Sequence, residues 1–108
     1  MTTVDLPPAR FAAKAGEAAM LLKALAHEGR LMVLCQLLNG EHSVGALQDA
    51  CGLSQSALSQ HLARLREEGL VATRRESQTI FYRLADPNVA RVLDTLAAIY
   101  CPPKRKRR

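Results

Sequence analysis

No stretch of this 108-residue chain is long and apolar enough to span a membrane. Its apolar runs stop well short of the roughly 20 consecutive residues that a bilayer-crossing helix needs. The N-terminus also lacks the basic segment followed by an apolar segment that directs a chain to export. We therefore expect a cytoplasmic protein that makes no contact with membranes.

Cysteine is scarce, and the three cysteines that occur, Cys35, Cys51 and Cys101, are far apart along the chain. The cytosol keeps thiols reduced, which excludes a disulfide framework as the basis of the fold. These residues are better explained as packing residues, metal ligands or redox groups. Cys51 precedes a glycine in a predicted turn, so we assign it a structural role.

The chain also lacks a nucleophile, a base and an orienting acid at a usable spacing, so we do not expect an enzyme. His27, His42 and His61 are scattered with no ligand spacing, and local caps or surface contacts explain them better than metal binding does. We expect neither a metal nor another cofactor.

The most informative stretch covers residues 53–69. Ser54 suits the N-cap of a helix, and Gly69 suits the left-handed residue that ends one. Leu58, Leu62 and Leu65 repeat at the spacing that forms one apolar stripe, which would dock this helix to a core.

The opposite face of this helix carries short or amide-bearing side chains and is flanked by arginines. Glutamine pairs bidentately with adenine in the major groove, and serine or arginine contacts base edges or phosphates. An ordinary solvated face is the alternative, but we favour a DNA recognition helix. The predicted contact residues on it are Ser54, Gln55, Ser56, Ser59, Gln60 and Arg64.

The neighbouring segments complete a winged helix-turn-helix. Ser43 caps a predicted short helix over 44–50, and Gly52 breaks the chain before the recognition helix. Residues 70–75 and 79–84 are β-prone and are joined by 76–78, which predicts a hairpin, the wing. Arg74 and Arg75 on this wing are predicted to contact the DNA backbone or minor groove.

Helices are predicted on both sides of this unit, over 11–26, over 28–38 and from Asp86 to about residue 100. The second of them has an apolar stripe of Leu31, Leu34, Cys35 and Leu38. With 48% hydrophobic residues, the chain supports one compact domain, which a partner subunit often completes. We assign 1–10 to a mobile lead-in, 11–101 to this domain and 102–108 to a basic tail.

The net charge of +5 resides in the tail, because residues 104–108 are all basic and the rest of the chain has ten basic and ten acidic residues. The tail either adds salt-sensitive, sequence-independent affinity for DNA or has no specific role. Local clustering of arginines matters more for phosphate binding than the sum does. In this chain the arginines concentrate in the predicted recognition helix and wing, at Arg64, Arg66, Arg74, Arg75 and Arg83.

The order of elements resembles the ArsR/SmtB family of bacterial repressors over about residues 18–101. The motifs that carry the resemblance are LSQSALSQHL at 53–62, EGLV at 68–71 and FYRL at 81–84. The resemblance implies a mainly α winged-helix homodimer joined through its first and last helices. It also implies a chemical signal that lowers operator affinity. Ser77 departs from the pattern, since glycine is expected at this turn position.

Two cysteines point to one branch of that family. Metal-sensing members carry cysteines on the first helix of the helix-turn-helix, or histidines on the last helix, and this chain has no cysteine over 44–50 and no histidine over 86–100. Cys35 and Cys101, with LLKALAHEGR at 21–30 and ARVLDTL at 90–96, are similar to the persulfide-responsive SqrR/BigR-like branch. This similarity implies that reactive sulfur species link the two thiols by a disulfide or polysulfide bridge, which releases the operator and derepresses sulfide-detoxification genes.

Three functions stay open at this point. The first is the reactive-sulfur sensor, and the second is a repressor that responds to a metal or a general oxidant through the same cysteines. The third is a DNA-binding protein with no effector.

Overall fold

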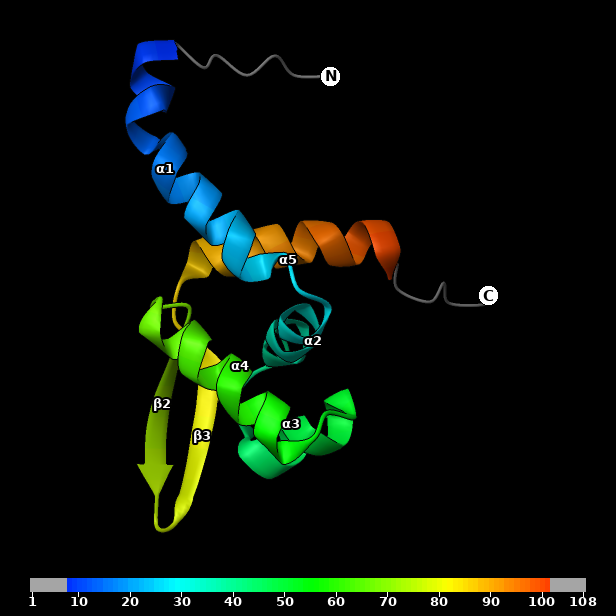
Figure 1. Ribbon diagram of the computed structural model, residues 1–108. Coiled ribbons are helices and arrows are strands. Elements are labelled where there is room, and N and C mark those ends of the chain that lie inside the picture. The colour runs from blue at the N-terminus through cyan, green and yellow to red at the C-terminus, as the bar shows by residue number, and fades with distance from the viewer. Residues whose placement is uncertain (1–7, 102–108) are drawn as a thin grey trace.

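The computed structural model describes residues 8–101, which form a mainly helical domain with one small sheet (Figure 1). The helices are α1 (Pro8–Leu25), α2 (Glu28–Leu37), α3 (Val44–Cys51), α4 (Gln55–Glu67) and α5 (Pro87–Tyr100). The strands are β1 (His42–Ser43), β2 (Val71–Glu76) and β3 (Thr79–Leu84). This order confirms the predicted winged helix-turn-helix, with α3 and α4 as its two helices and β2 and β3 as the wing.

Positions 1–7 of the predicted lead-in lie outside the described residues. The whole of the predicted basic tail, 102–108, also lies outside them. Within the described part, no helix has the length and apolar character required to cross a membrane.

Three of the helices begin at the hydroxyl or carboxylate N-caps that the sequence predicts. Ser43 Oγ accepts the Ala46 amide and Ser54 Oγ accepts the Ala57 amide, both at 3.1 Å. Asp86 Oδ1 accepts the Asn88 amide at 2.9 Å, and Pro87 follows it in the first turn of α5. These bonds satisfy amides that a helix start leaves without a partner, so the boundaries are fixed locally.

The sheet has one strand more than the predicted hairpin. β1 pairs antiparallel with β3, which gives the order β1-β3-β2. A two-residue strand has too short a pattern to be detected in the sequence. The wing turn contains Ser77 at φ 61°, a left-handed conformation that explains why glycine is the expected residue there.

Helix α1 projects from the body of the molecule (Figure 1). It begins at Pro8 rather than at residue 11, and proline suits the first turn because its missing N–H has no helical partner there. Only Ala24 and Leu25, at its C-terminal end, are buried. Phe11, together with several other apolar side chains of this helix, is exposed.

Arg30 holds the end of α1 against α2. This buried side chain donates from Nε to the Ala24 carbonyl at 2.6 Å and from Nη2 to the Lys23 carbonyl at 3.2 Å. A cation at a helix C-terminus interacts favourably with the carbonyls left free there. Nothing in the local sequence distinguishes this arginine from an exposed one, and the sequence analysis did not identify it.

Helix α2 occupies the centre of the domain, where it packs against α1, α3, α4, α5 and β3. Val33, Leu34 and Leu37 form its buried face, so the predicted stripe was partly wrong. Leu31, Cys35 and Leu38 are only partly buried, and they flank the core. The error arose because apolar side chains surround this helix on several sides, which leaves its periodicity ambiguous.

The start of α2 also contacts the recognition helix directly. His27 caps α2, since its Nδ1 accepts the Gly29 amide at 3.0 Å, and its ring lies 4.6 Å from the ring of His61 on α4. A Cβ built on Gly29 would lie 2.7 Å from Nε2 of His61. The absence of a side chain at Gly29 therefore lets α4 approach α2 closely.

We expect Gly29→Ala to lower the free energy of unfolding by about 1 kcal/mol, because overpacking costs more than alanine gains in helix propensity. Gly45→Ala in α3 is the matched control: its Cβ meets nothing within 4 Å, so the same change should stabilise by up to about 1 kcal/mol. Urea denaturation measures both. The loss at Gly29 should disappear in a His61→Ala background. Equal stabilisation by the two alanines would contradict this account of the α2–α4 contact.

Candidate functional site

The outward face of α4 is polar along its length. Gln55, Ser56, Ser59 and Gln60 are all exposed, while Leu58, Leu62 and Leu65 are buried, as predicted. The hydroxyl of Ser54 is engaged as the helix cap, so it is less available for another contact than the four residues that follow. This arrangement leaves a convex, amide- and hydroxyl-bearing ridge of the size that a major groove admits.

The arginines predicted to contact DNA from the recognition helix and the wing differ in what they contact. Arg64 donates from Nε to Oε2 of Glu68, the C-cap residue of α4, at 3.0 Å. Arg75 donates from Nε to the Ser77 carbonyl at 3.2 Å, which ties it to the wing turn. Both side chains are exposed, and surface pairs of this kind are weak enough to exchange for a phosphate.

Arg74 is the most strongly engaged of the predicted contact residues. Its Nε lies 2.7 Å from Oε2 of Glu41, its Nη1 lies 3.4 Å from Oε1 of Glu76, and its guanidinium stacks 4.6 Å above the Phe81 ring. The hydrogen bond to Glu41 raises the pKa of Arg74. Because two carboxylates already surround this cation, its principal contacts join the wing to the loop before β1.

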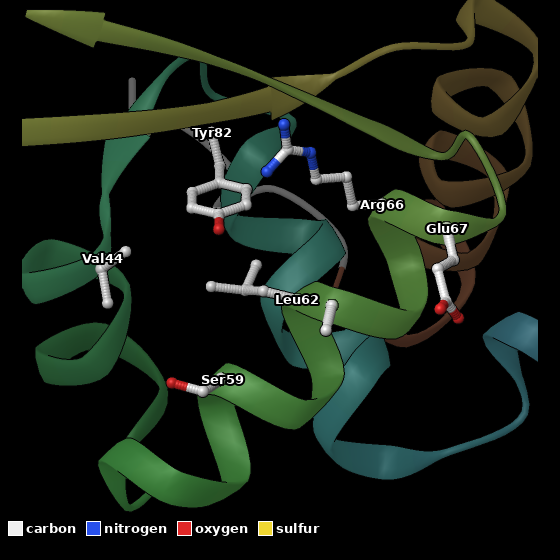
Figure 2. Close-up of a pocket in the computed structure, with 7 residues that line it drawn as sticks. Val44, Ser59, Leu62, Arg66, Glu67 and Tyr82 are labelled. Atoms are coloured by element: carbon white, nitrogen blue, oxygen red, sulfur yellow. The ribbon is translucent and has the colours of Figure 1, made fainter.

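Arg66 faces a hollow between the recognition helix and the wing. The sequence places it among the clustered arginines beside the recognition face, although it is not one of the predicted contact residues. Figure 2 shows Arg66 of α4 and Tyr82 of β3 directed into the same space, with Ser59 and Leu62 on the adjoining turns of α4. The cavity has a volume of about 500 Å³. Among residues 8–101, no hydrogen bond or ion pair to the Arg66 guanidinium is found.

Tyr82 had no distinguishing signal in the sequence, because strand alternation alone does not show which residues face the recognition helix. Arg66 did have a signal, its position two residues after Arg64 at the end of the same helix. The structure adds that Arg66 points under the wing, so its positive charge lies between the two elements that would approach DNA.

A second cavity, of about 710 Å³, lies between α2 and α5 and brings Cys35 and Cys101 together. Cys35 is partly buried on α2, and Cys101 is exposed where α5 ends. These residues are 66 positions apart, and the contact of α2 with α5 places both in the lining of one cavity. The lining consists of Glu28, Leu31, Met32, Cys35, Leu38, Asn39, Leu96, Ala97, Tyr100 and Cys101.

Burial and charge both act on the thiols. Burial raises the pKa of Cys35, and the neighbouring thiolate charge of Cys101 raises it further. Burial alone raises the pKa of Cys51, which lies in the core at the end of α3, as the structural role predicted for it requires. A raised pKa keeps a thiol protonated and slows its attack on an electrophile.

The histidines make local contacts. His42 Nδ1 lies 2.9 Å from the Gly40 carbonyl oxygen, and His27 caps α2. Burial lowers the pKa of His61, and the charges of His27 and Arg30 lower it further. Within residues 8–101, no group of three or more histidine, cysteine or acidic side chains is placed to hold a metal ion.

Comparison with known proteins gives a consistent result. The family model described as bacterial regulatory protein, arsR family, matches residues 27–73. The biofilm growth-associated repressor of Agrobacterium fabrum is 48% identical over 100 residues, which cover 93% of this chain and 86% of that protein. The transcriptional activator HlyU of Vibrio cholerae is 54% identical over 85 residues, which cover 79% of each.

Solved structures agree with the fold. The transcriptional repressor BigR from Xylella fastidiosa matches with a TM-score of 0.83 at 44% identity, over 89% of this chain and 98% of that chain. Reduced HlyU from Vibrio cholerae matches with a TM-score of 0.81 at 50% identity, over 85% of this chain and 97% of that chain.

The three thiols should differ in their reaction with iodoacetamide. At neutral pH we expect exposed Cys101 to react first, Cys35 more slowly and buried Cys51 last. The thiolate fraction of Cys35 rises about tenfold per pH unit up to its raised pKa, so its rate should keep rising where an ordinary thiol has levelled off. Peptide mass spectrometry over a pH series measures each rate.

The control for this prediction is Cys101→Ser, which removes one of the two causes of the shift. The profile of Cys35 should then move to lower pH while staying above that of an ordinary thiol, because burial remains. A Cys35 rate that levels off at or below the pH of an ordinary thiol would contradict the prediction.

Proposed function

The chain belongs to the ArsR family of bacterial regulatory proteins, and on this premise we propose that it is a transcriptional repressor controlled by reactive sulfur. In this proposal, persulfides or polysulfides link Cys35 to Cys101, the protein releases its operator, and sulfide-detoxification genes are derepressed. The observation that carries the proposal is the shared cavity of the two thiols between α2 and α5.

DNA binding is assigned to the outward face of α4 and to the wing. Gln55, Ser56, Ser59 and Gln60 are placed to meet base edges in the major groove, because they are exposed along one side of the helix. Arg66 is added to the predicted set as a phosphate contact, since its charge lies between α4 and the wing. Arg74 is assigned mainly to holding the wing in place.

The thiol chemistry follows from exposure. Cys101 is the more accessible thiol, so it takes a sulfur atom from a persulfide RSSH and releases the thiol RSH. Cys35 then loses its proton and attacks the inner sulfur of this persulfide, which is the Sγ atom of Cys101. Attack on the inner sulfur gives a disulfide and releases hydrogen sulfide, so two thiols are oxidised and one sulfane sulfur is reduced.

A bridge between α2 and α5 would act on DNA affinity through α2. This helix packs against α4 as well as α5, and the rings of His27 and His61 lie 4.6 Å apart where the start of α2 meets α4. We propose that α1 and α5 form a homodimer interface, because both carry large exposed apolar side chains, among them Phe11, Met20 and Ile99. The two recognition helices must then enter major grooves about 34 Å apart, so a changed α2–α5 geometry lowers affinity at both half-sites.

A general oxidant is the competing effector, since peroxide also joins two thiols. The two chemistries differ in their products: peroxide gives a disulfide alone, whereas a polysulfide leaves additional sulfur atoms in the bridge. The solved relative named reduced HlyU indicates that redox state was distinguished for that protein, which supports thiol control here without selecting the oxidant.

Persulfide treatment should lower operator affinity of the unmodified protein by roughly 5- to 150-fold, the usual size of an allosteric coupling. Cys35→Ser and Cys101→Ser should each reduce this change to less than about twofold, because neither variant can form the bridge. Gel-shift titration with the promoter fragment next to the gene measures the affinities. Cys51→Ala is the matched control and should respond like the unmodified protein. Persistent release by treated Cys35→Ser would refute the dithiol mechanism.

The role of Arg66 is tested by salt dependence. Arg66→Gln should reduce the slope of log K against log salt concentration by about one unit, as expected when one phosphate contact is lost. Arg74→Gln is the control of equal charge change, and it should alter the slope by less than about half a unit because two carboxylates already neutralise that cation. Fluorescence anisotropy over a salt series measures both. A larger change for Arg74 than for Arg66 would reverse the assignment.

A further inference from the structure

The thiol pair lies in an apolar cavity, and this property bears on which sulfur compounds reach it. Leu31, Met32, Leu38, Leu96 and Tyr100 supply most of its walls. Its volume of about 710 Å³ lies within the ~300–1,000 Å³ range of small-molecule sites. A cross-link between two thiols requires no such space, so the cavity suggests that the carrier of the sulfur atom is itself bound.

The charged and polar residues of the cavity favour a neutral ligand. Of its ten lining residues in the described part of the chain, Glu28 is the one that carries a formal charge, and that charge is negative. Asn39 is the other strongly polar side chain. An anionic carrier would lose its hydration against apolar walls without gaining an opposite charge from this lining.

We propose that the cavity selects uncharged, apolar carriers of sulfane sulfur, such as dialkyl polysulfides or neutral sulfur chains, over anionic persulfides and polysulfides. The inference rests on the proposed function, because it takes Cys35 and Cys101 as the reacting groups. It goes beyond that function in naming the class of compound and in assigning recognition to the side chains around the thiols. Apolar burial then raises the local concentration of the carrier beside both sulfur atoms.

The reaction balances with a dialkyl trisulfide, RS–S–SR, as both sulfur donor and oxidant. The Cys101 thiolate attacks the central sulfur, one S–S bond breaks, and an alkanethiolate leaves. The Cys35 thiolate attacks the same sulfur and displaces the second alkanethiolate. The two protons lost by the cysteines end on the two alkanethiols, and the chain gains one sulfur atom as Cys35–S–S–S–Cys101.

Dipropyl trisulfide and glutathione trisulfide make a matched pair of probes, since both have the same reactive group and only the second is charged. Each rate of bridging is divided by the rate of the same reagent with the urea-unfolded chain, which removes differences in intrinsic reactivity. High salt screens attraction to basic residues. Intact-mass spectrometry of the full chain without DNA measures the bridged fraction with time. We expect the normalised rate to be at least tenfold higher for dipropyl trisulfide.

Chain length provides a second measure. Along the series dimethyl, diethyl and dipropyl trisulfide, the normalised rate should rise by about two- to fourfold per methylene group buried, fourfold being the limit for full burial. A rate that is flat along the series would overturn the proposal. So would a glutathione trisulfide rate equal to or above that of dipropyl trisulfide.

Met32→Lys tests the assignment to this cavity. Met32 is 43% exposed, so a lysine fits without being buried, and its charge enters the lining. We expect the preference for the neutral reagent to fall at least fivefold. Ile80→Lys is the matched control, because Ile80 is a 39% exposed residue of the wing that does not line the cavity and gains the same charge. Equal effects of the two lysines would overturn the proposal.

These outcomes are separable from those of the proposed function. If dipropyl trisulfide bridges the thiols selectively and the bridged protein keeps its operator affinity, the cavity assignment stands and the proposed function fails. If both reagents bridge equally and the bridged protein releases DNA, the proposed function stands and the cavity assignment fails. If neither reagent bridges the thiols, both fail.

Discussion

The structure depends above all on the burial of α2 between the other elements. Val33, Leu34 and Leu37 are almost fully inaccessible, and the helix contacts α1, α3, α4, α5 and β3. Protein interiors are packed at the density of organic crystals, so a helix enclosed on several sides does not shift alone. Any change in how α2 meets one neighbour is therefore transmitted to the others. This constraint connects a thiol on one flank of α2 to the recognition helix on another.

The contrast with α1 clarifies how the domain divides. That helix meets the rest of the described chain chiefly at its last turn, through Ala24, Leu25 and the two carbonyls that Arg30 holds. Its remaining length offers apolar side chains to solvent. One end of the molecule is thus suited to association and the opposite face to contact with DNA, and α2 lies between them. Arg30 connects α1 to α2 through hydrogen bonds. This connection is kept because a buried cation that loses its acceptors lowers the stability of the folded state.

Much of this architecture could be predicted from local sequence, and the exceptions have physical causes. The caps Ser43, Ser54 and Asp86 and the stripe Leu58, Leu62, Leu65 act within one helical turn or along one face, so their signals are complete in the sequence. The buried face of α2 was partly misassigned because apolar residues surround that helix. Strand β1 was not predicted because it consists of only two residues. It forms through pairing with β3, about 40 positions away, where His42 lies opposite Tyr82.

The same distinction applies to the candidate site. The outward residues of α4 follow from helical periodicity. The contacts of the arginines instead depend on partners remote in sequence. Glu41, 33 positions away, accepts a hydrogen bond from Arg74, and Arg66 faces a hollow that Tyr82 also lines. The two thiols were paired by family resemblance, and spacing alone does not bring positions 35 and 101 together. What the sequence did not indicate at all is the character of the space around them. In the function that we propose, specificity for a reactive sulfur compound depends on that space. A thiol discriminates poorly among electrophiles, whereas an apolar wall disfavours those that must keep their water.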